Sequence, residues 1–445
     1  MRLAVCSPLP PAATGIADYT ADVLALLAGR HEIDVFHAQE SVERTRLPRE
    51  CNVLPVSAFL DRQRGQPYDA VVYQMGNGPG HAFLYDILSR VPGLLVLHDL
   101  VLHHSRAAHF LEAEPVRAWR RDPADPAARE AARLWLDRWR DELVYSYPRR
   151  GERLFEVQLG TLGPLLPYAY PLLRIPVEAS RLVGVHSAFA AEAVRAEAPE
   201  AEVVHLAMPA EAVVVEPGRV RDTRRRLGFG DEDLVVGSFG LLTPEKRVET
   251  VARAVAGVAA RDARVRLLLA GPVPDRAQLA RMLERLGVAE RSVVTGRLPF
   301  DELPAHMEAA DIVVHLRYPT ARETSAALLR ILAQGRPVIL SDLEHQAEIP
   351  PEAVVRADVA DEEGEVTRAI SSLAVDAERR LELGRQAAAY ARREHAPERT
   401  RQTWEDALDR LRGRPDPPPR SWPDHWPRPQ AASGIRPSVA GRARS

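Results

Sequence analysis

The stretch VVGSFGLLTPEKR, residues 235–247, carries the pattern that decides the fold. An apolar run, Val235–Phe239, ends at Gly240, and a helical pattern begins just after Lys246. A strand that runs through a short glycine-containing turn into a helix is the repeating unit of a parallel α/β sheet. The first turn of a helix also has free backbone N–H groups, so this turn is a candidate phosphate site.

Lys246 is the only lysine in the chain, and every other strongly basic residue is arginine. Lysine is a compact point charge on a thin stem, whereas arginine is a broad planar fork. A lysine retained at a strand-to-helix turn is therefore a candidate phosphate ligand, although codon bias could leave one lysine there by chance. The turn is not a Walker A loop, because that motif needs Gly-Lys-Ser/Thr at a fixed spacing.

Apolar runs alternate with amphipathic helical patterns through most of the 445 residues. This length predicts two domains, and the alternation predicts a doubly wound parallel sheet in each. The predicted strands of the first half are Leu3–Cys6, Ile33–Phe36, Val71–Gln74, Leu94–Leu97 and Leu182–Val185. Those of the second half are Val235–Phe239, Val265–Ala270, Val293–Thr295, Ile312–His315 and Val338–Leu340.

The breaks in this alternation set the expected domain boundaries. Between residues 105 and 180 only helical patterns appear, such as Ala127–Tyr145, and the tail after residue 412 contains eight prolines and little apolar pattern. Such a tail cannot bury enough apolar surface to fold. We expect an N-terminal domain over 1–208 with a helical insertion at 105–180, a C-terminal domain over 221–395, a terminal helix over 396–412 and a disordered tail over 413–445.

Composition excludes several classes of function. The net charge of −3 gives no electrostatic case for nucleic-acid binding. No apolar run reaches the ~18 residues of a membrane span, and the short apolar start lacks the features of a signal peptide, so we expect a cytoplasmic protein. The apolar segment Leu159–Tyr168 suits peripheral contact with lipid or a partner, but packing within the insertion is the simpler explanation.

Three further motifs lie where parallel strands are expected to end. Thr14, Gly15 and Ile16 follow the first strand and open a helix, which could face an anion or be an ordinary turn. His98 ends another strand, where it could donate to a hydroxyl. The neighbouring pair His103–His104 is a poor metal site, because adjacent residues on a helix do not converge on one ion.

The segment Arg322–Gly335 predicts a helix that runs into the last strand. Thr324 or Ser325 is a natural N-cap, and Gly335 is a natural helix end. Such an N-terminus would hold a diphosphate well, and Glu323 beside it could accept hydrogen bonds from sugar hydroxyls. The alternative is a plain capped helix in which Glu323 only favours the helix dipole.

Together, the order and spacing of these motifs make residues 1–410 resemble a family-4 retaining glycosyltransferase of the GT-B fold. The motifs that carry the resemblance are Thr14–Tyr19, Val96–Asp99, His186-Ser187, Gly240 with Lys246, Ala270-Gly271, Gly296, Arg322–Gly335 with Pro337-Val338-Ile339, and Glu348-Ile349-Pro350. The resemblance implies two Rossmann-like domains facing a cleft, with an acceptor on the N-terminal domain and a nucleotide-sugar donor on the C-terminal domain.

In this resemblance His98 and Glu323 would position the transferred sugar. The donor diphosphate would be held by Thr14, Gly15, Ile16, Gly240, Lys246, Arg247, Thr324 and Ser325. Two departures stand out. Leu241 and Leu242 occupy the place of a usual arginine, for which Arg247 is the candidate substitute. Arg322 and Arg330 occupy the places of two usual glutamates, the second of which binds the nucleotide ribose in the family.

The expected function is transfer of a sugar from a nucleotide-diphosphate donor to an acceptor hydroxyl, with retention of configuration. The acceptor would be a glycan, a lipid-linked molecule or a small molecule. Fixed cations and helix amides would neutralise the leaving group, so no metal or other cofactor is expected. Two alternatives remain: a non-catalytic nucleotide-sugar or glycan-binding protein of GT-B descent, and a GT-B nucleotide-sugar epimerase, for which Asp99 alone offers a carboxylate.

Overall fold

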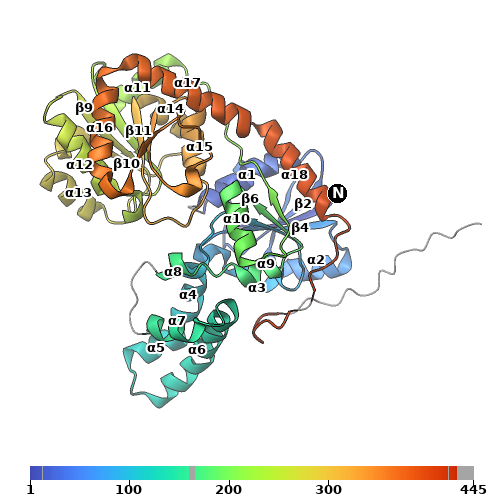
Figure 1. Cartoon of the computed structure of the whole chain (residues 1–445). Coiled ribbons are helices and arrows are strands. Elements are labelled where there is room, and N and C mark those ends of the chain that lie inside the picture. The colour runs from blue at the N-terminus through green and yellow to red at the C-terminus, as the bar shows by residue number, and fades with distance from the viewer. Residues whose placement is uncertain (13, 160–165, 419, 428–445) are drawn as a thin grey trace, which may run out of the picture.

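A computed structural model of the chain describes residues 1–12, 14–159, 166–418 and 420–427, and it contains two parallel sheets (Figure 1). The first sheet has seven strands in the order β3-β2-β1-β4-β5-β6-β7. Their bounds are β1 (Arg2–Cys6), β2 (Glu32–His37), β3 (Asn52–Pro55), β4 (Ala70–Met75), β5 (Leu94–Leu97), β6 (Leu182–Val185) and β7 (Val203–His205). The order turns back at β1, which leaves a crevice beyond the carboxyl ends of the central strands.

The second sheet has six strands in the order β10-β9-β8-β11-β12-β13. Their bounds are β8 (Leu234–Phe239), β9 (Val265–Ala270), β10 (Ser292–Gly296), β11 (Ile312–His315), β12 (Val338–Ser341) and β13 (Val355–Ala357). Every residue of the central strand β8 is buried, because helices cover both faces of the sheet. The predicted architecture of two doubly wound α/β domains is therefore confirmed, although each sheet is larger than the five strands expected.

Helices cover the faces of both sheets. The first sheet carries α1 (Gly15–Leu27), α2 (Phe59–Gly65), α3 (Ala82–Leu88) and α10 (Ala188–Glu197). The second carries α11 (Pro217–Arg226), α12 (Val248–Ala259), α13 (Arg276–Arg285), α14 (Leu303–Ala309), α15 (Ala326–Ala333) and α16 (Glu362–Val375). Within these described residues, no helix has the length and apolar character needed to cross a membrane.

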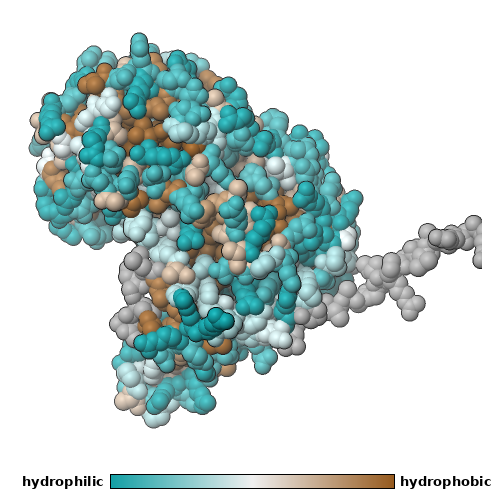
Figure 2. Space-filling model, viewed as in Figure 1, coloured by the Kyte–Doolittle hydropathy of each residue, from teal (hydrophilic) through white to brown (hydrophobic). Residues whose placement is uncertain are grey.

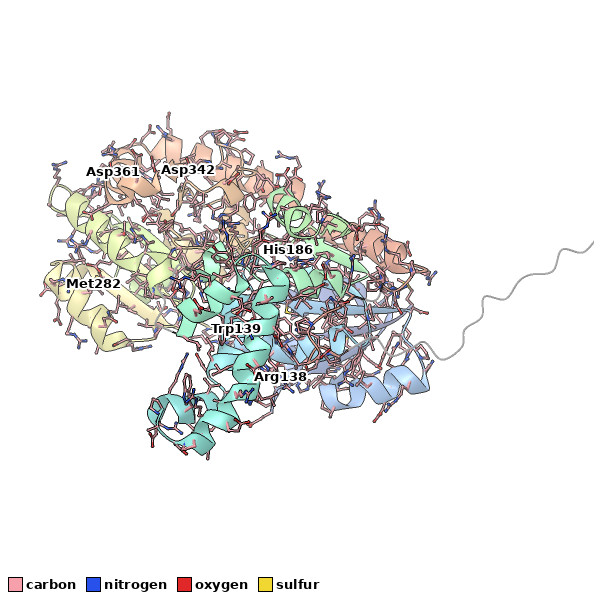
Figure 3. All side chains as sticks on the ribbon, turned by 60° about the horizontal axis from the view of Figure 1, so that its bottom comes forward. Arg138, Trp139, His186, Met282, Asp342 and Asp361 are labelled. Atoms are coloured by element: carbon pink, nitrogen blue, oxygen red, sulfur yellow. The ribbon has the colours of Figure 1, made fainter. Side chains whose placement is uncertain are left out.

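The chain between β5 and β6 forms a helical insertion that projects below the first sheet in Figure 1. It contains α4 (His103–Leu111), α5 (Glu114–Arg121), α6 (Pro126–Ser146), α7 (Gly151–Leu159), α8 (Leu166–Ala169) and α9 (Arg174–Glu178). Trp139 of α6 is fully buried among these helices with Phe110 and Leu154 (Figure 3). Residues 160–165 of the apolar segment considered for lipid contact lie outside the described residues. On the face drawn in Figure 2, hydrophobic residues show in separate patches on a mostly hydrophilic surface.

The last two helices cross back from the second domain to the first. Helix α17 (Ala377–Glu394) packs on α15, and α18 (Pro397–Leu411) packs on α1 (Figure 1). Trp404 of α18 donates its indole N–H to the Tyr19 hydroxyl at 3.2 Å, in the core beneath α1. The C-terminal helix is therefore part of the N-terminal domain's core, and it ties the two domains together.

The proline-rich tail continues along the N-terminal domain. Over its described residues, 413–418 and 420–427, it forms no helix or strand, which agrees with the predicted lack of regular structure. It is nevertheless docked, since Trp422 and Trp426 are buried and donate to Glu178 at 3.2 Å and Glu142 at 2.7 Å. The sequence did not predict this docking. Residues 419 and 428–445 lie outside the described residues.

Candidate active site

The two domains meet where the strands of both sheets end. The backbone N–H of Leu100, just after β5, donates to the carbonyl of Ala321, just before α15, at 3.0 Å. This bond places the His98–Asp99 turn of the N-terminal domain against the loop that begins α15. The predicted site residues on β5 and α15 are thus brought together from separate domains.

His98 lies at the centre of a buried hydrogen-bond chain. Its Nε2 faces the Gln74 amide at 2.7 Å, and its Nδ1 faces His186 Nε2 at 3.2 Å. His186 Nδ1 in turn lies 2.8 Å from the Leu206 carbonyl. Burial lowers the pKa of both imidazoles, that of His186 to about 4, so both rings are neutral near pH 7.

The direction of this chain follows from its last acceptor. The Leu206 carbonyl can only accept, so His186 carries its proton on Nδ1 and its Nε2 accepts from His98 Nδ1. His98 Nε2 is then unprotonated and can only accept, so the Gln74 amide, whose Oε1 is placed 2.7 Å away and whose buried Nε2 has no partner among the described residues, is to be turned over so that its NH₂ group faces the ring. Both ring nitrogens of His98 are used inside the protein. Both ring nitrogens of His186 are used in the same way, so a direct contact between His98 and a sugar stays a prediction.

Lys246 is paired with a cation that the sequence reasoning missed. Arg317 follows β11, and together with burial, the larger cause, it lowers the pKa of Lys246 well below its usual value. Burial also lowers the pKa of Arg317 to about 10, while Asp99 and Glu245 act in the opposite direction. No ion pair or side-chain hydrogen bond joins Lys246 to any residue in the described ranges. Lys246 and Arg317 therefore form a partly buried basic pair, in which Lys246 has no ion-pair partner among the described residues.

Arg317 also joins this basic pair to the start of α15. Its guanidinium forms an ion pair with Glu323 and lies 3.4 Å from Ser325 Oγ. Ser325 is the N-cap of α15, where its hydroxyl accepts from the backbone N–H of Leu328 at 3.3 Å. The other oxygen of Glu323 accepts from Thr320 Oγ1 at 2.8 Å. The carboxylate of Glu323 is thus held by Thr320 and Arg317, with Thr324 and Ser325 beside it.

Gly240, Thr14, Gly15 and Ile16 also lie at this side of the domains. Gly240 has a φ of 114°, which favours glycine, and a Cβ added there would lie 3.9 Å from Lys246 Nζ. Thr14 caps α1 by accepting from the Ala17 N–H at 3.1 Å. Gly15 begins α1 with open space around it and without a positive φ, so the turn itself does not require glycine there. Ile16 packs toward Gly76, at the end of β4.

The structure does not place Arg247 with the basic pair. Its Nε donates to Glu362 at 2.7 Å, and the other oxygen of Glu362 accepts from Ser341 Oγ at 2.7 Å. Arg247 therefore binds the start of α16, on the side of the C-terminal domain's own core. The cation beside Lys246 is instead Arg317, supplied by the end of a different strand.

Arg330, at the place of the usual ribose-binding glutamate, contacts the N-terminal domain instead. Its Nη2 lies 2.6 Å from Asp22 Oδ2 on α1, and its guanidinium lies over the Phe300 ring at 4.9 Å from the centroid. Arg46 of the N-terminal domain lies over the same ring at 4.5 Å and forms an ion pair with Asp18 at 2.7 Å. Phe300 therefore sits between two guanidinium groups, one from each domain.

Reversing the charge of Arg330 is expected to loosen the contact between the domains. Burial raises the pKa of Asp22 more than Arg330 lowers it, so the net contribution of the pair is small, of order 1 kcal/mol. In Arg330→Glu two carboxylates face each other, and we expect a larger radius of gyration by small-angle scattering. The double variant Asp22→Arg/Arg330→Asp restores the pair and should return the wild-type value. An unchanged radius in the single variant would show that this pair does not hold the domains.

A cavity of about 270 Å³ opens between the domains beside the start of α15. His186 and Ser187 form its N-terminal wall, as Figure 3 shows for His186, which lies where the two domains face each other. Glu323, Thr324 and Ser325 form the opposite wall. Within the described residues no group of His, Cys, Asp or Glu side chains is arranged to hold a metal ion.

Some site residues were not predicted from the sequence, although they also lie at strand ends, as His98 does. Arg317 comes two residues after a predicted strand, so the strand-end argument that singled out His98 applied to it equally. Gln74 is the second-last residue of β4 and was predicted only as a strand residue. Asp22 and Phe300 gave no comparable signal, because their roles depend on how the two domains meet.

Comparison with known proteins bears on this arrangement. Residues 233–376 match the family model described as Glycosyl transferases group 1. The chain is 30% identical over 138 residues to 2-deoxystreptamine glucosyltransferase of Streptomyces kanamyceticus, covering 31% of this chain and 35% of that protein. It is 34% identical over 116 residues to the GDP-mannose-dependent alpha-(1-6)-phosphatidylinositol monomannoside mannosyltransferase of Mycolicibacterium smegmatis, covering 26% and 30%. The alignments thus span about a third of the length of these curated relatives.

Solved structures are similar over nearly the whole chain. Anabaena HepE, in complex with UDP and glucose, has a TM-score of 0.63 at 16% identity and covers 92% of this chain and 100% of its own. Sucrose-phosphate synthase from Thermosynechococcus elongatus has a TM-score of 0.63 at 15% identity and covers 92% and 98%. At these identities the similarity establishes the fold. Two Rossmann-like domains that face each other define a GT-B protein. The chain therefore has the GT-B fold, and its residues 233–376 are similar to a Glycosyl transferases group 1 domain.

Proposed function

We propose that this protein transfers a sugar from a nucleotide-diphosphate donor to an acceptor hydroxyl, with retention of configuration at the anomeric carbon. The observation that carries the proposal is the basic pair of Lys246 and Arg317 beside the N-cap Ser325 of α15. Two cations and a helix N-terminus converge at the end of a parallel sheet, where nucleotides bind in doubly wound folds.

This arrangement suits a diphosphate leaving group. Negative charge grows on the bridging oxygen as the bond to the sugar breaks, and preorganised cations and backbone N–H groups stabilise it. Lys246 acts as a point charge, while Arg317 is held in place by Glu323 and Ser325. These groups neutralise the diphosphate without a metal ion, so turnover is expected to persist in the presence of EDTA.

The relatives guide the choice of donor and acceptor. HepE is seen with UDP and glucose and with UDP-glucose, and the mycobacterial relative is named as GDP-mannose-dependent. The names of the two curated relatives specify 2-deoxystreptamine and a phosphatidylinositol monomannoside. We therefore propose a nucleoside-diphosphate hexose as donor, and a glycan, a lipid-linked molecule or a small polyol as acceptor.

A donor panel tests this function. UDP-glucose, GDP-mannose and related nucleotide-sugars are added in turn, and the melting temperature and the release of nucleoside diphosphate are measured. A donor at about 100 times its Kd is expected to stabilise the fold by about 2.7 kcal/mol, which corresponds to several degrees in Tm. Product configuration from NMR reports retention. No stabilisation by any donor would contradict the proposal, and stabilisation without turnover across acceptors would favour the non-catalytic binding protein.

A further inference from the structure

The end of the described tail bridges two apolar cores. Trp422 and Trp426 pack in the core of the N-terminal domain, where Trp426 lies edge-on to Tyr85 of α3 with ring centroids 5.7 Å apart. The helical insertion has a small core of its own. Both tail indoles donate to carboxylates of the insertion, Glu178 on α9 and Glu142 on α6. The tail therefore links the insertion to the domain that carries it.

Each of these two carboxylates also binds another helix of the insertion. Glu142 holds Arg106 of α4 in a buried ion pair, and Glu178 accepts from the Tyr145 hydroxyl of α6 at 2.5 Å. The Arg106 guanidinium also lies over the Trp426 ring, 5.1 Å from its centroid. Since buried polar and charged groups are stable only when paired, this network favours one placement of α4, α6 and α9 against α3.

Helix α4 carries this placement to the active-site turn. The Asn77 side-chain oxygen accepts from the backbone N–H of Ser105 at 3.1 Å, and its NH₂ group lies 2.9 Å from His104 Nδ1. The backbone N–H of Asn77 donates to Asp99 Oδ2 at 2.7 Å. Arg106, which the tail holds, is the next residue of α4. A shift of α4 is therefore passed directly to the turn that contains Asp99.

The start of α4 also presents a hydrogen-bond donor toward the C-terminal domain. Because His104 Nδ1 accepts from Asn77 and burial lowers the pKa of the ring, the neutral imidazole carries its proton on Nε2. Glu245, which precedes Lys246, acts on this pKa in the opposite direction, so its carboxylate lies near the ring. Tyr168 of α8 packs edge-on against the same ring at 5.1 Å. The insertion therefore forms a wall of the site across from the basic pair.

We propose that residues Trp422–Trp426 are an intramolecular strap, which holds the insertion where it completes the acceptor side of the active site. Trp426 is then a positioning residue, because it acts on α4 through Glu142 and lies outside the site. The kinetic consequence rests on the proposed function, whereas the mechanical role of the strap does not. When the strap is released, the basic pair of the C-terminal domain stays in place and the wall that faces it is displaced.

Hydrogen exchange followed by mass spectrometry tests the strap without any ligand. In full-length Trp422→Ala/Trp426→Ala we expect the amides of α4 and α6 to exchange about tenfold faster, because the insertion then opens locally, while those of α12 and α15 stay unchanged. Trp422→Phe/Trp426→Phe keeps both rings without their N–H groups and should give a smaller rise, even if the alanine variant folds poorly. Arg414→Ala removes the tail's ion pair with Glu202 beside β7 and is the matched control, with no change expected in α4 or α6.

Kinetics tests what the strap does for the reaction. For the donor and acceptor on which the wild type turns over, kcat/KM for the acceptor should fall by about 10- to 100-fold in the alanine variant, as expected when a distant change misplaces a positioning group. The Kd of UDP or GDP, whichever the wild type binds, should stay within about twofold.

Three results would overturn parts of this inference in distinguishable ways. Unchanged exchange of α4 and α6 in both tryptophan variants would show that the tail is no strap. Faster exchange with wild-type acceptor kinetics, or with an equal loss of nucleotide affinity, would show that the strap does not serve the acceptor side. If the wild type turns over no donor, the proposed function fails, and the exchange data still decide whether the tail holds the insertion.

Discussion

Lys246→Ala is expected to lower kcat/KM with the donor by about 10²- to 10³-fold, the usual cost of removing one preorganised group from a developing charge. Lys246 is partly buried, has no ion pair among the described residues and lies beside Arg317. The substitution therefore removes a charge that is available to bind the ligand and that makes no ion pair holding the fold together in the described part of the chain. Steady-state kinetics and the Kd of the nucleoside diphosphate measure the loss.

Matched variants separate this effect from a general change in charge. Arg253→Ala removes one exposed positive charge from the same domain, where the side chain pairs with Glu249 at the surface, and should leave kcat/KM unchanged. Arg317→Lys keeps the charge but loses the fork that spans Glu323 and Ser325, so an intermediate loss is expected. Wild-type kinetics in Lys246→Ala would show that the diphosphate binds elsewhere.

A proton-uptake measurement adds an independent check on Lys246. Burial and Arg317 hold its pKa well below the usual value, and an anion bound beside it favours the protonated ammonium. Binding of a nucleoside diphosphate should therefore take up protons, most strongly above the pKa of the free protein, and the affinity should fall as pH rises through that range. Calorimetry in buffers of different ionisation enthalpy detects the uptake, which should decrease in Lys246→Ala.

The central strands were predictable because they are buried on both faces and therefore read as unbroken apolar runs. The three strands that the sequence did not predict are β3, β7 and β13, and each is a short strand at the edge of its sheet. Edge strands bury less surface, and residues such as Asn52 and Arg356 interrupt their apolar pattern. The number of strands in each sheet was therefore underestimated, while the layer architecture and topology class were not.

The site residues also divide into those that the local sequence predicts and those that it does not. Local rules placed Ser325 as an N-cap and Gly335 at the end of α15, since caps depend on the residues next to them. Partners across the molecule did not follow from local rules. Arg317 reaches Lys246 from another strand, Arg330 reaches Asp22 from another domain, and the tail reaches the insertion from the far end of the chain.

Glu142→Ala is expected to destabilise the N-terminal domain by about 3–5 kcal/mol, the cost of leaving one partner of a buried ion pair alone. Glu142 of α6 is 2% exposed and binds Arg106 of α4, which is also buried. The same carboxylate accepts from His425 at 2.8 Å and from Trp426 at 2.7 Å, both in the C-terminal tail. One substitution therefore breaks the contacts that hold together α4, α6 and the tail.

Urea unfolding followed by tryptophan fluorescence measures the loss of stability. The solvent-exposed ion pair between Arg140 and Glu152 serves as the control. Glu152→Ala removes the partner of Arg140 on neighbouring helices at the surface, and little change in the midpoint is expected. The double variant Arg106→Met/Glu142→Leu removes both charges and should recover part of the lost stability, because no buried charge is left unpaired while the Trp426 indole N–H still loses its acceptor.

Acid provides the complementary test of Glu142. Burial alone would raise its pKa, but Arg106 and His425 outweigh burial and lower it to about 2. A carboxyl whose pKa is lower in the folded state than in the unfolded state, about 4.3, stabilises the fold above that value and loses its contribution as pH falls toward 2. The wild type should therefore lose stability more steeply than the double variant between about pH 4.3 and 2. Parallel acid curves for the two proteins would show that the ion pair, and with it the docking of the tail, contributes no net stability.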